Sequence, residues 1–176
     1  KTHSHSEVIM LINGKDLLDL APIKNMETTK VVFNGVSYGL SEAGYDIRIK
    51  QTVRFYRNLR GMRQVQIIDG DKITDLKGRF TLASGIEEFC MPGNLTGVTH
   101  DKSTWAREGL SVFNTVIEPG WRGFLTLELV HKGNNDLIIE AGSGIAQVLF
   151  HINSRFAEYN GKYQDQANQP VAAIRK

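Results

Sequence analysis

Side chains capable of chemistry gather in a short stretch in the second half of the chain. Lys102, Ser103 and Arg107 come first, and the acids Glu118 and Glu128 follow. Ser103 and Arg107 are four residues apart, so a single helical turn would place them on one face. Ammonium, hydroxyl and guanidinium groups can all bind phosphate oxygens. The stretch therefore predicts anion recognition at one end and a carboxylate in an apolar strand at the other, which are features of a site that handles a nucleotide.

Glu128 stands in the segment FLTLELV, whose alternation is typical of a strand. Phe124, Thr126, Glu128 and Val130 would share one face, and the intervening leucines the other. A carboxylate among apolar neighbours is costly to bury without a partner. One interpretation is a general base whose pKa is raised by desolvation. The other is an ordinary acid on the wet face of an edge strand, and spacing alone favours neither.

The basic cluster also has two interpretations. It can cradle phosphates, or it can be a solvated helix start capped by Ser103, and taken alone it favours the second. Lys162, Tyr163 and Gln166 in GKYQDQ form another group able to bind phosphate, unless they belong to a disordered terminus. Trp121, after Pro-Gly, is most simply an aromatic packed beside a turn.

Composition narrows the class of protein. The 176 residues predict one domain over 1–176, in which 1–9 are a possible extension before Met10 and 153–176 a C-terminal tail or lid. A net charge of +2 does not favour nucleic acid or a membrane as partner. No apolar run approaches the roughly 20 residues that span a bilayer. The single cysteine, Cys90, excludes an intramolecular disulfide and fits the reducing cytoplasm.

Metal chemistry has little support in the sequence. The five histidines show no HxxxH spacing, and there is no pair of cysteines. The zinc deaminase signature, the nucleophile elbow, the Walker loop and the Rossmann glycine pattern are also missing. We therefore expect no metal ligands among the site residues and no zinc.

The hydrophobic pattern predicts an all-β fold with minor helices. A short helix is expected over residues 13–20. We expect strands over residues 30–33, 45–57, 64–68, 80–82, 86–91, 95–99, 109–113, 122–130, 137–139 and 145–152. Regularly spaced strands with 17 glycines for turns indicate a sandwich or barrel. The polar segment after Ile152 is expected to lie over another part of the molecule.

Motifs in a fixed order carry a resemblance to a known family. The segments SYGLSEAGYDIRI, KSTWAREGL, TVIEPGWRGFLTLEL, GIAQVLF and GKYQDQ resemble the successive motifs of dCTP deaminases, in the dUTPase-like superfamily. The resemblance covers residues 36–166, and the segment 59–93 matches poorly. It implies a distorted β-barrel of the dUTPase type, assembled as a homotrimer with active sites at subunit boundaries.

The resemblance also implies a reaction: hydrolytic deamination of dCTP to dUTP and ammonia, without zinc, with Mg²⁺ accompanying the triphosphate. Glu128 falls on the catalytic glutamate, and Ser103 and Arg107 on residues that hold water and substrate. Glu118 falls on the acid that contacts the sugar. The remaining substrate-binding positions would be Lys102, Thr104, Thr115, Val116, Trp121, Thr126, Gln147, Tyr159, Lys162, Tyr163 and Gln166.

Two departures from the family pattern, and three other functions, stay open. His131 replaces the usual asparagine, and Val116 replaces alanine or proline, which leaves room for a modified cytosine. Glu118 could serve a second step, so a bifunctional deaminase–dUTPase is one alternative. A dUTPase is another, although the superfamily's pyrophosphatases carry Asp where this chain has Glu118. The third is a non-catalytic nucleotide-binding protein on the same fold.

Overall fold

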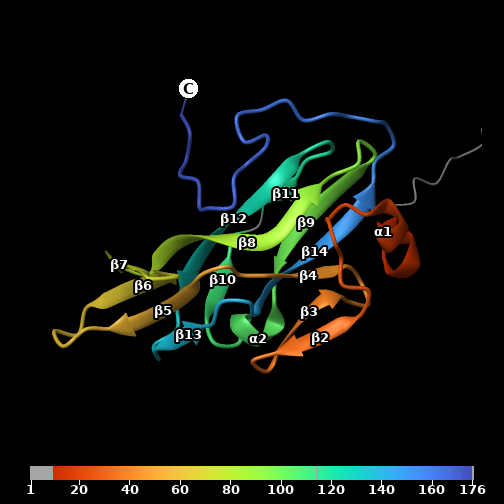
Figure 1. Ribbon diagram of the computed structural model, residues 1–176. Coiled ribbons are helices and arrows are strands. Elements are labelled where there is room, and N and C mark those ends of the chain that lie inside the picture. Colours follow the sequence, from red (N-terminus) through yellow and green to blue (C-terminus); the bar gives the residue numbers. More distant parts are fainter. Residues whose placement is uncertain (1–9, 114, 176) are drawn as a thin grey trace, which may run out of the picture.

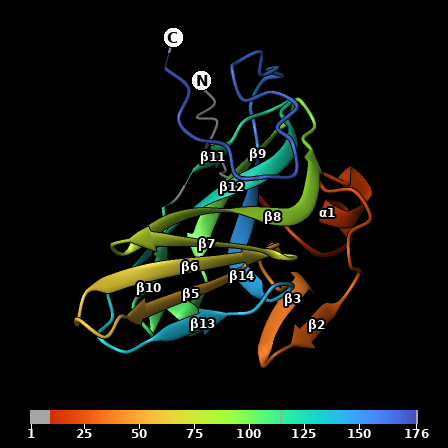
Figure 2. The same cartoon turned by 60° about the vertical axis from the view of Figure 1, so that its left-hand side comes forward.

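The computed structural model describes residues 10–113 and 115–175, so the predicted extension over 1–9 lies outside the described residues. The chain forms antiparallel sheets with two short helices (Figures 1 and 2). The helices are α1 (Gly14–Leu20) and α2 (Ser103–Ala106). The prediction of a mostly β-stranded fold with minor helices is confirmed.

The largest sheet has seven strands in the order β11-β9-β14-β4-β3-β2, with β1 also paired to β14. Its members are β1 (Leu11–Ile12), β2 (Lys30–Phe33), β3 (Val36–Leu40), β4 (Tyr45–Arg48), β9 (Leu95–Asp101), β11 (Val116–Ile117) and β14 (Gly144–Ile152). A second sheet has the order β10-β12-β8, formed by β8 (Phe80–Cys90), β10 (Leu110–Val112) and β12 (Arg122–His131).

The third sheet projects from the body in Figure 1 and has the order β13-β5-β6-β7. Its strands are β5 (Thr52–Arg57), β6 (Arg63–Asp69), β7 (Lys72–Lys77) and β13 (Leu137–Ile139). Strands β1, β3, β7 and β11 were not expected from the sequence. Strand β3 crosses the glycine-punctuated segment because Gly39, with φ +90°, adopts a backbone conformation that other residues rarely take.

The prediction of one strand from Tyr45 to Arg57 is wrong. The alternation is real, but the chain passes from one sheet to another between β4 and β5, where Ile49 and Gln51 are both buried. The Gln51 side chain accepts a hydrogen bond from the Ser84 amide at 2.9 Å and donates one to the Ser84 hydroxyl at 3.0 Å. These bonds satisfy the buried Gln51 side chain at the point where the chain changes sheets.

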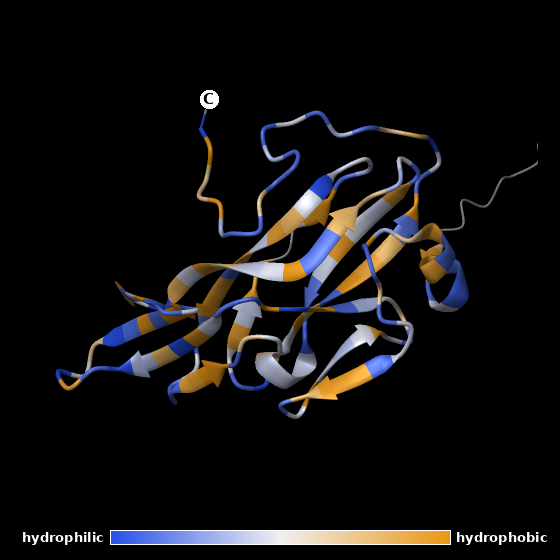
Figure 3. Cartoon of the chain, in the orientation of Figure 1, coloured by the Kyte–Doolittle hydropathy of each residue, from blue (hydrophilic) through white to orange (hydrophobic). Residues whose placement is uncertain are grey.

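Strand β8 is also continuous where two strands were expected. Ser84 and Gly85 interrupt the hydrophobic pattern, but they mark a shift in register against β12 and not a turn. The two strands pair from Arg122↔Cys90 to Val130↔Phe80. Strand β12 therefore lies in the middle of its sheet, and its leucines Leu125, Leu127 and Leu129 join the buried core. Figure 3 shows the corresponding alternation of apolar and polar residues along the strands.

The C-terminal segment leaves β14 and returns across the end of the molecule to β12 (Figure 1). Gln166 forms a parallel bridge with Gly123, and its carbonyl accepts a hydrogen bond from the Phe124 amide at 3.0 Å. The indole of Trp121 donates to the Tyr163 carbonyl at 2.6 Å. The segment thus lies over another part of the molecule, as expected, and that part is the strand that carries Glu128.

Candidate active site

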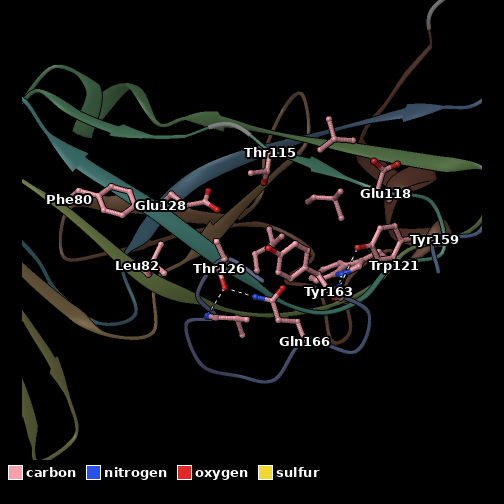
Figure 4. A pocket seen from close by; sticks show the side chains of 15 residues that line it. Phe80, Leu82, Thr115, Glu118, Trp121, Thr126, Glu128, Tyr159, Tyr163 and Gln166 are labelled. Carbon is pink, nitrogen blue, oxygen red and sulfur yellow. Dashed lines mark hydrogen bonds between the residues drawn. The ribbon is translucent and has the colours of Figure 1, made fainter. Parts of the chain in front are cut away.

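A pocket opens between β12, the loop that leads into β11, and the C-terminal segment (Figure 4). Its cavity is about 410 Å³. The lining residues are Phe80, Leu82, Thr115, Val116, Ile117, Glu118, Trp121, Leu125, Thr126, Glu128, Tyr159, Tyr163, Gln166, Val171 and Ala173. A mostly apolar cavity with a few polar groups is the usual form of a small-molecule site.

Glu128 lies on the face of β12 that looks into this pocket. Its strand has the alternating burial expected of FLTLELV, with the leucines on the buried side and Glu128 partly buried. Figure 4 shows its carboxyl group directed into the pocket, on the side of Thr115. Partial burial raises the pKa of Glu128, which favours a proton-transfer role. The strand therefore presents a carboxyl group that can take up and return a proton.

The charged residues that line the pocket are all acidic. Glu118 and Glu128 both line it, whereas none of its lining residues is a lysine, arginine or histidine. Thr115, Thr126 and Gln166 supply neutral hydrogen-bonding groups. Such a lining can hold a nucleobase and sugar, but a triphosphate needs cations from outside this cavity.

The predicted residues divide into two groups by position. The pocket brings together Glu128, Thr115, Val116, Glu118, Trp121, Thr126, Tyr159, Tyr163 and Gln166. Within one chain it does not bring Lys102, Ser103, Thr104, Arg107, Gln147 or Lys162 to that lining. Gln147 instead donates to the Ser41 hydroxyl at 3.0 Å. The Lys162 ammonium binds the Ile174 carbonyl and lies 5.2 Å from the centre of the Tyr163 ring.

The α2 region forms a separate surface. Ser103, Thr104 and Arg107 are exposed on α2 and the turn after it. Arg107 lines another cavity together with His131, whose ring Nε2 is 2.9 Å from the Glu108 carbonyl. His131 thereby helps to fix the turn that carries Arg107.

Lys102, unlike its exposed neighbours on α2, is held in an ion pair inside the protein. Its ammonium group binds the carboxylate of Asp46, which is 3% exposed, and the Ser37 hydroxyl at 3.0 Å. Asp46 stands in the YDIRI segment, which we expected only to be a strand with polar residues on its wet face. The buried pairing was not apparent from that alternation, although the position of Asp46 within a family motif was a usable signal.

Several residues that line the pocket of Glu128 were not predicted from the sequence. Phe80 and Leu82 belong to the segment that matches the family poorly, and nothing in their pattern separates them from core residues. Val171 and Ala173 reach the pocket only because the C-terminal segment folds back. In the part of the chain that the structure describes, no three His, Cys, Asp or Glu side chains are placed to hold a metal ion. No helix in the described ranges is long and apolar enough to cross a membrane.

Comparisons with known proteins agree on one family. Residues 23–153 match the dCTP deaminase-like family. The dCTP deaminase of Campylobacter concisus is 37% identical over 155 residues, covering 80% of this chain and 83% of that protein. The dCTP deaminase of Protochlamydia amoebophila is 35% identical over 145 residues, covering 74% of this chain and 77% of that protein.

Solved structures agree on the fold. A 2'-deoxycytidine 5'-triphosphate deaminase from Agrobacterium tumefaciens superposes with a TM-score of 0.54 at 14% identity, covering 85% of this chain and 50% of that chain. The EIAV dUTPase superposes with a TM-score of 0.50 at 13% identity, covering 88% and 97%. At such identities the likeness concerns the fold alone, which is dUTPase-like. The family match and the sequence identities go further, and the chain belongs to the dCTP deaminase family.

Proposed function

We propose that this protein deaminates dCTP to dUTP and ammonia by hydrolysis without zinc, with Glu128 as general acid and base. The observation that carries the proposal is the partly buried carboxyl group of Glu128, directed into a pocket with the dimensions of a small-molecule site. The names of the relatives at 35–37% identity support the choice of substrate.

The proposed steps balance with water as the only co-reactant. Glu128 takes a proton from water as the oxygen attacks C4 of the cytosine. It delivers that proton to N3, then takes the proton of the new C4 hydroxyl and passes it to the departing amine, so that the C4–N bond breaks, the C4 carbonyl of uracil forms and ammonia leaves. Hydrogen-bond donors aimed at the developing charge lower the barrier. We assign the backbone of Thr115 and Val116 to contact with the base and Glu118 to contact with the sugar, which their place in the lining of the pocket supports.

The pocket has no lysine, arginine or histidine in its lining, which supports an assembly in which a neighbouring copy supplies positive charge. Because Ser103 and Arg107 face outward on α2, a neighbouring copy would have to present them to Glu128, which is the arrangement of a homotrimer with shared sites. The triphosphate would enter as its Mg²⁺ complex and be bound by Lys162 and Gln166 of the C-terminal segment. Lys102 of a neighbour would join them only by leaving its ion pair with the buried Asp46. Movement of that segment as a lid would close the pocket to bulk solvent while the attacking water stays bound beside Glu128.

A bifunctional deaminase–dUTPase is the second candidate, because the Glu118 carboxylate lines the same pocket as Glu128. One experiment separates the candidates: parallel incubations with dCTP and with dUTP, each with Mg²⁺, are followed by chromatographic separation of dUTP from dUMP and by measurement of ammonia. We expect ammonia and dUTP in equal amounts. Accumulation of dUMP would favour the bifunctional enzyme, hydrolysis of dUTP without ammonia would indicate a dUTPase, and binding without turnover would leave a nucleotide-binding protein.

A further inference from the structure

Two half-exposed aromatic residues meet above the strand that carries Glu128. The ring centroids of Phe80 and Phe113 are 6.1 Å apart, with an angle of 33° between the ring planes. Phe80 belongs to β8, and Phe113 directly follows β10. These two strands lie on opposite sides of β12 in the sheet. Their rings can touch only by reaching over one face of β12.

The register identifies that face. Phe80 pairs with Val130, and Leu82 pairs with Glu128. Val112 pairs with Leu129, and the Phe113 amide donates to the Glu128 carbonyl at 3.0 Å, so Phe113 stands opposite Glu128. Cross-strand partners share a face of the sheet. The aromatic pair therefore crosses β12 on the face of Glu128.

This arrangement surrounds the stem of Glu128 with apolar groups. Leu82 is its neighbour on β8, and Phe113 is its neighbour on the side of β10. Phe80 is its diagonal neighbour, because Phe80 pairs with Val130. Figure 4 shows Phe80 to the left of Glu128, on the side away from Trp121 and Tyr159. The carboxyl group itself is directed into the pocket.

Partial burial, and not a neighbouring charge, raises the pKa of Glu128. On β8 the neighbours are Phe80, Leu82 and Ser84, none of them charged. On β10, Ser111 donates its hydroxyl to Asp101 at 3.1 Å. Across the pocket the titratable residues are Glu118, Tyr159 and Tyr163.

We propose that the Phe80–Phe113 pair is a positioning element for Glu128, which shields the rear of the carboxyl group from water and directs it toward the substrate. Its link to deamination rests on the proposed function, whereas the effect on Glu128 itself does not. Desolvation of a carboxyl group disfavours its charged form. Opening the rear of the site to water should therefore lower the pKa of Glu128 and make it a weaker base.

The test compares Phe113→Ala, Phe80→Ala and the double variant with the conservative Phe113→Leu. Phe156→Ala is the matched control, because Phe156 is 80% exposed and lies outside this pocket. The Glu128 carboxyl group is titrated by NMR in protein labelled with carbon-13 at the glutamate side chains, and its signal is assigned by its loss in Glu128→Gln. Thermal unfolding and circular dichroism establish that each variant is folded.

We expect the Glu128 titration to move to lower pH in each alanine variant and furthest in the double variant. It should stay near its original position in Phe113→Leu and Phe156→Ala. The acid limb of the kcat/KM profile should move in parallel, with a loss of kcat well short of the roughly 10²–10⁴-fold that removing a proton-transfer group costs. An unchanged Glu128 titration in a folded double variant would overturn the proposal. If the unaltered protein lacks deaminase activity, the proposed function fails while the titration still decides the role of the pair.

Discussion

The side-chain amide of Gln166 donates a hydrogen bond to the hydroxyl of Thr126, which attaches the C-terminal segment to the strand that carries Glu128. The same hydroxyl accepts a second bond from the Val171 amide at 3.0 Å. Thr126 and Glu128 are on one face of β12, so this junction lies within the pocket. One hydroxyl group thus holds two points of the segment against the site.

Replacement of that hydroxyl should loosen the segment. Thr126→Val keeps the shape of the side chain but leaves both donors without their acceptor, and an unpaired buried donor costs about 1–3 kcal/mol. We expect faster hydrogen exchange of the Val171 amide and a higher KM for dCTP. Thr96→Val is the control, because it removes a hydroxyl that binds Asn153 away from the pocket. Equal exchange in Thr126→Val and the unaltered protein would contradict the prediction.

The two acids of the pocket should be separable by their kinetics. Glu128→Gln cannot take a proton from water, so kcat for deamination should fall by roughly 10²–10⁴-fold while the affinity for dCTP stays similar. Glu118→Gln should mainly raise KM, and it should abolish any formation of dUMP. Ammonia release and calorimetric binding of dCTP provide the measurements. Substantial turnover by a folded Glu128→Gln variant would remove Glu128 from the mechanism.

Stability should depend on pH through Glu128. Because burial raises the folded pKa of Glu128 above the ordinary value of a glutamate, the native state holds this proton more tightly than the unfolded chain. The free energy of unfolding contributed by this group is greatest below the unfolded pKa and falls as the pH rises through the folded pKa. Glu128→Gln should therefore match the unaltered protein near pH 4 and become relatively more stable toward pH 8.

Urea unfolding at several pH values measures this difference. Glu118→Gln is the matched control, because it removes one carboxylate from the same pocket at an exposed position. A difference between Glu128→Gln and the unaltered protein that is constant with pH would show that Glu128 does not titrate in the expected direction.

If active sites are shared between copies of the chain, two inactive variants should recover a predictable fraction of the activity when mixed. Arg107→Ala and Glu128→Gln should each be inactive alone, but co-expression should restore activity in mixed assemblies. If each site takes Glu128 from one copy and Arg107 from its neighbour, random mixing leaves about a quarter of the sites intact. Differently tagged copies show whether mixed assemblies form. Mixed assemblies without recovered activity would place both residues in one chain's site, whereas activity of Arg107→Ala alone would exclude Arg107 from the site.

Local patterns along the chain were sufficient for the class of fold and for much of the pocket. The alternation around Glu128 established which of its neighbours share its face, because the two-residue period of a strand leaves little freedom. The order of the motifs indicated the family, and most of the predicted base-side and tail residues do meet in one cavity. These features depend on contacts close in sequence or on motifs that carry their own spacing.

The tertiary structure alone decided which distant segments meet. The passage of the chain between two sheets at Gln51, the pairing of Lys102 with buried Asp46, and the meeting of Phe80 with Phe113 over β12 all depend on strand register across long separations. Register sets which side chains face each other, and no local pattern encodes it when both partners lie in ordinary strands. For the same reason, the sequence did not indicate that Ser103 and Arg107 lie outside the pocket of Glu128 in the same chain.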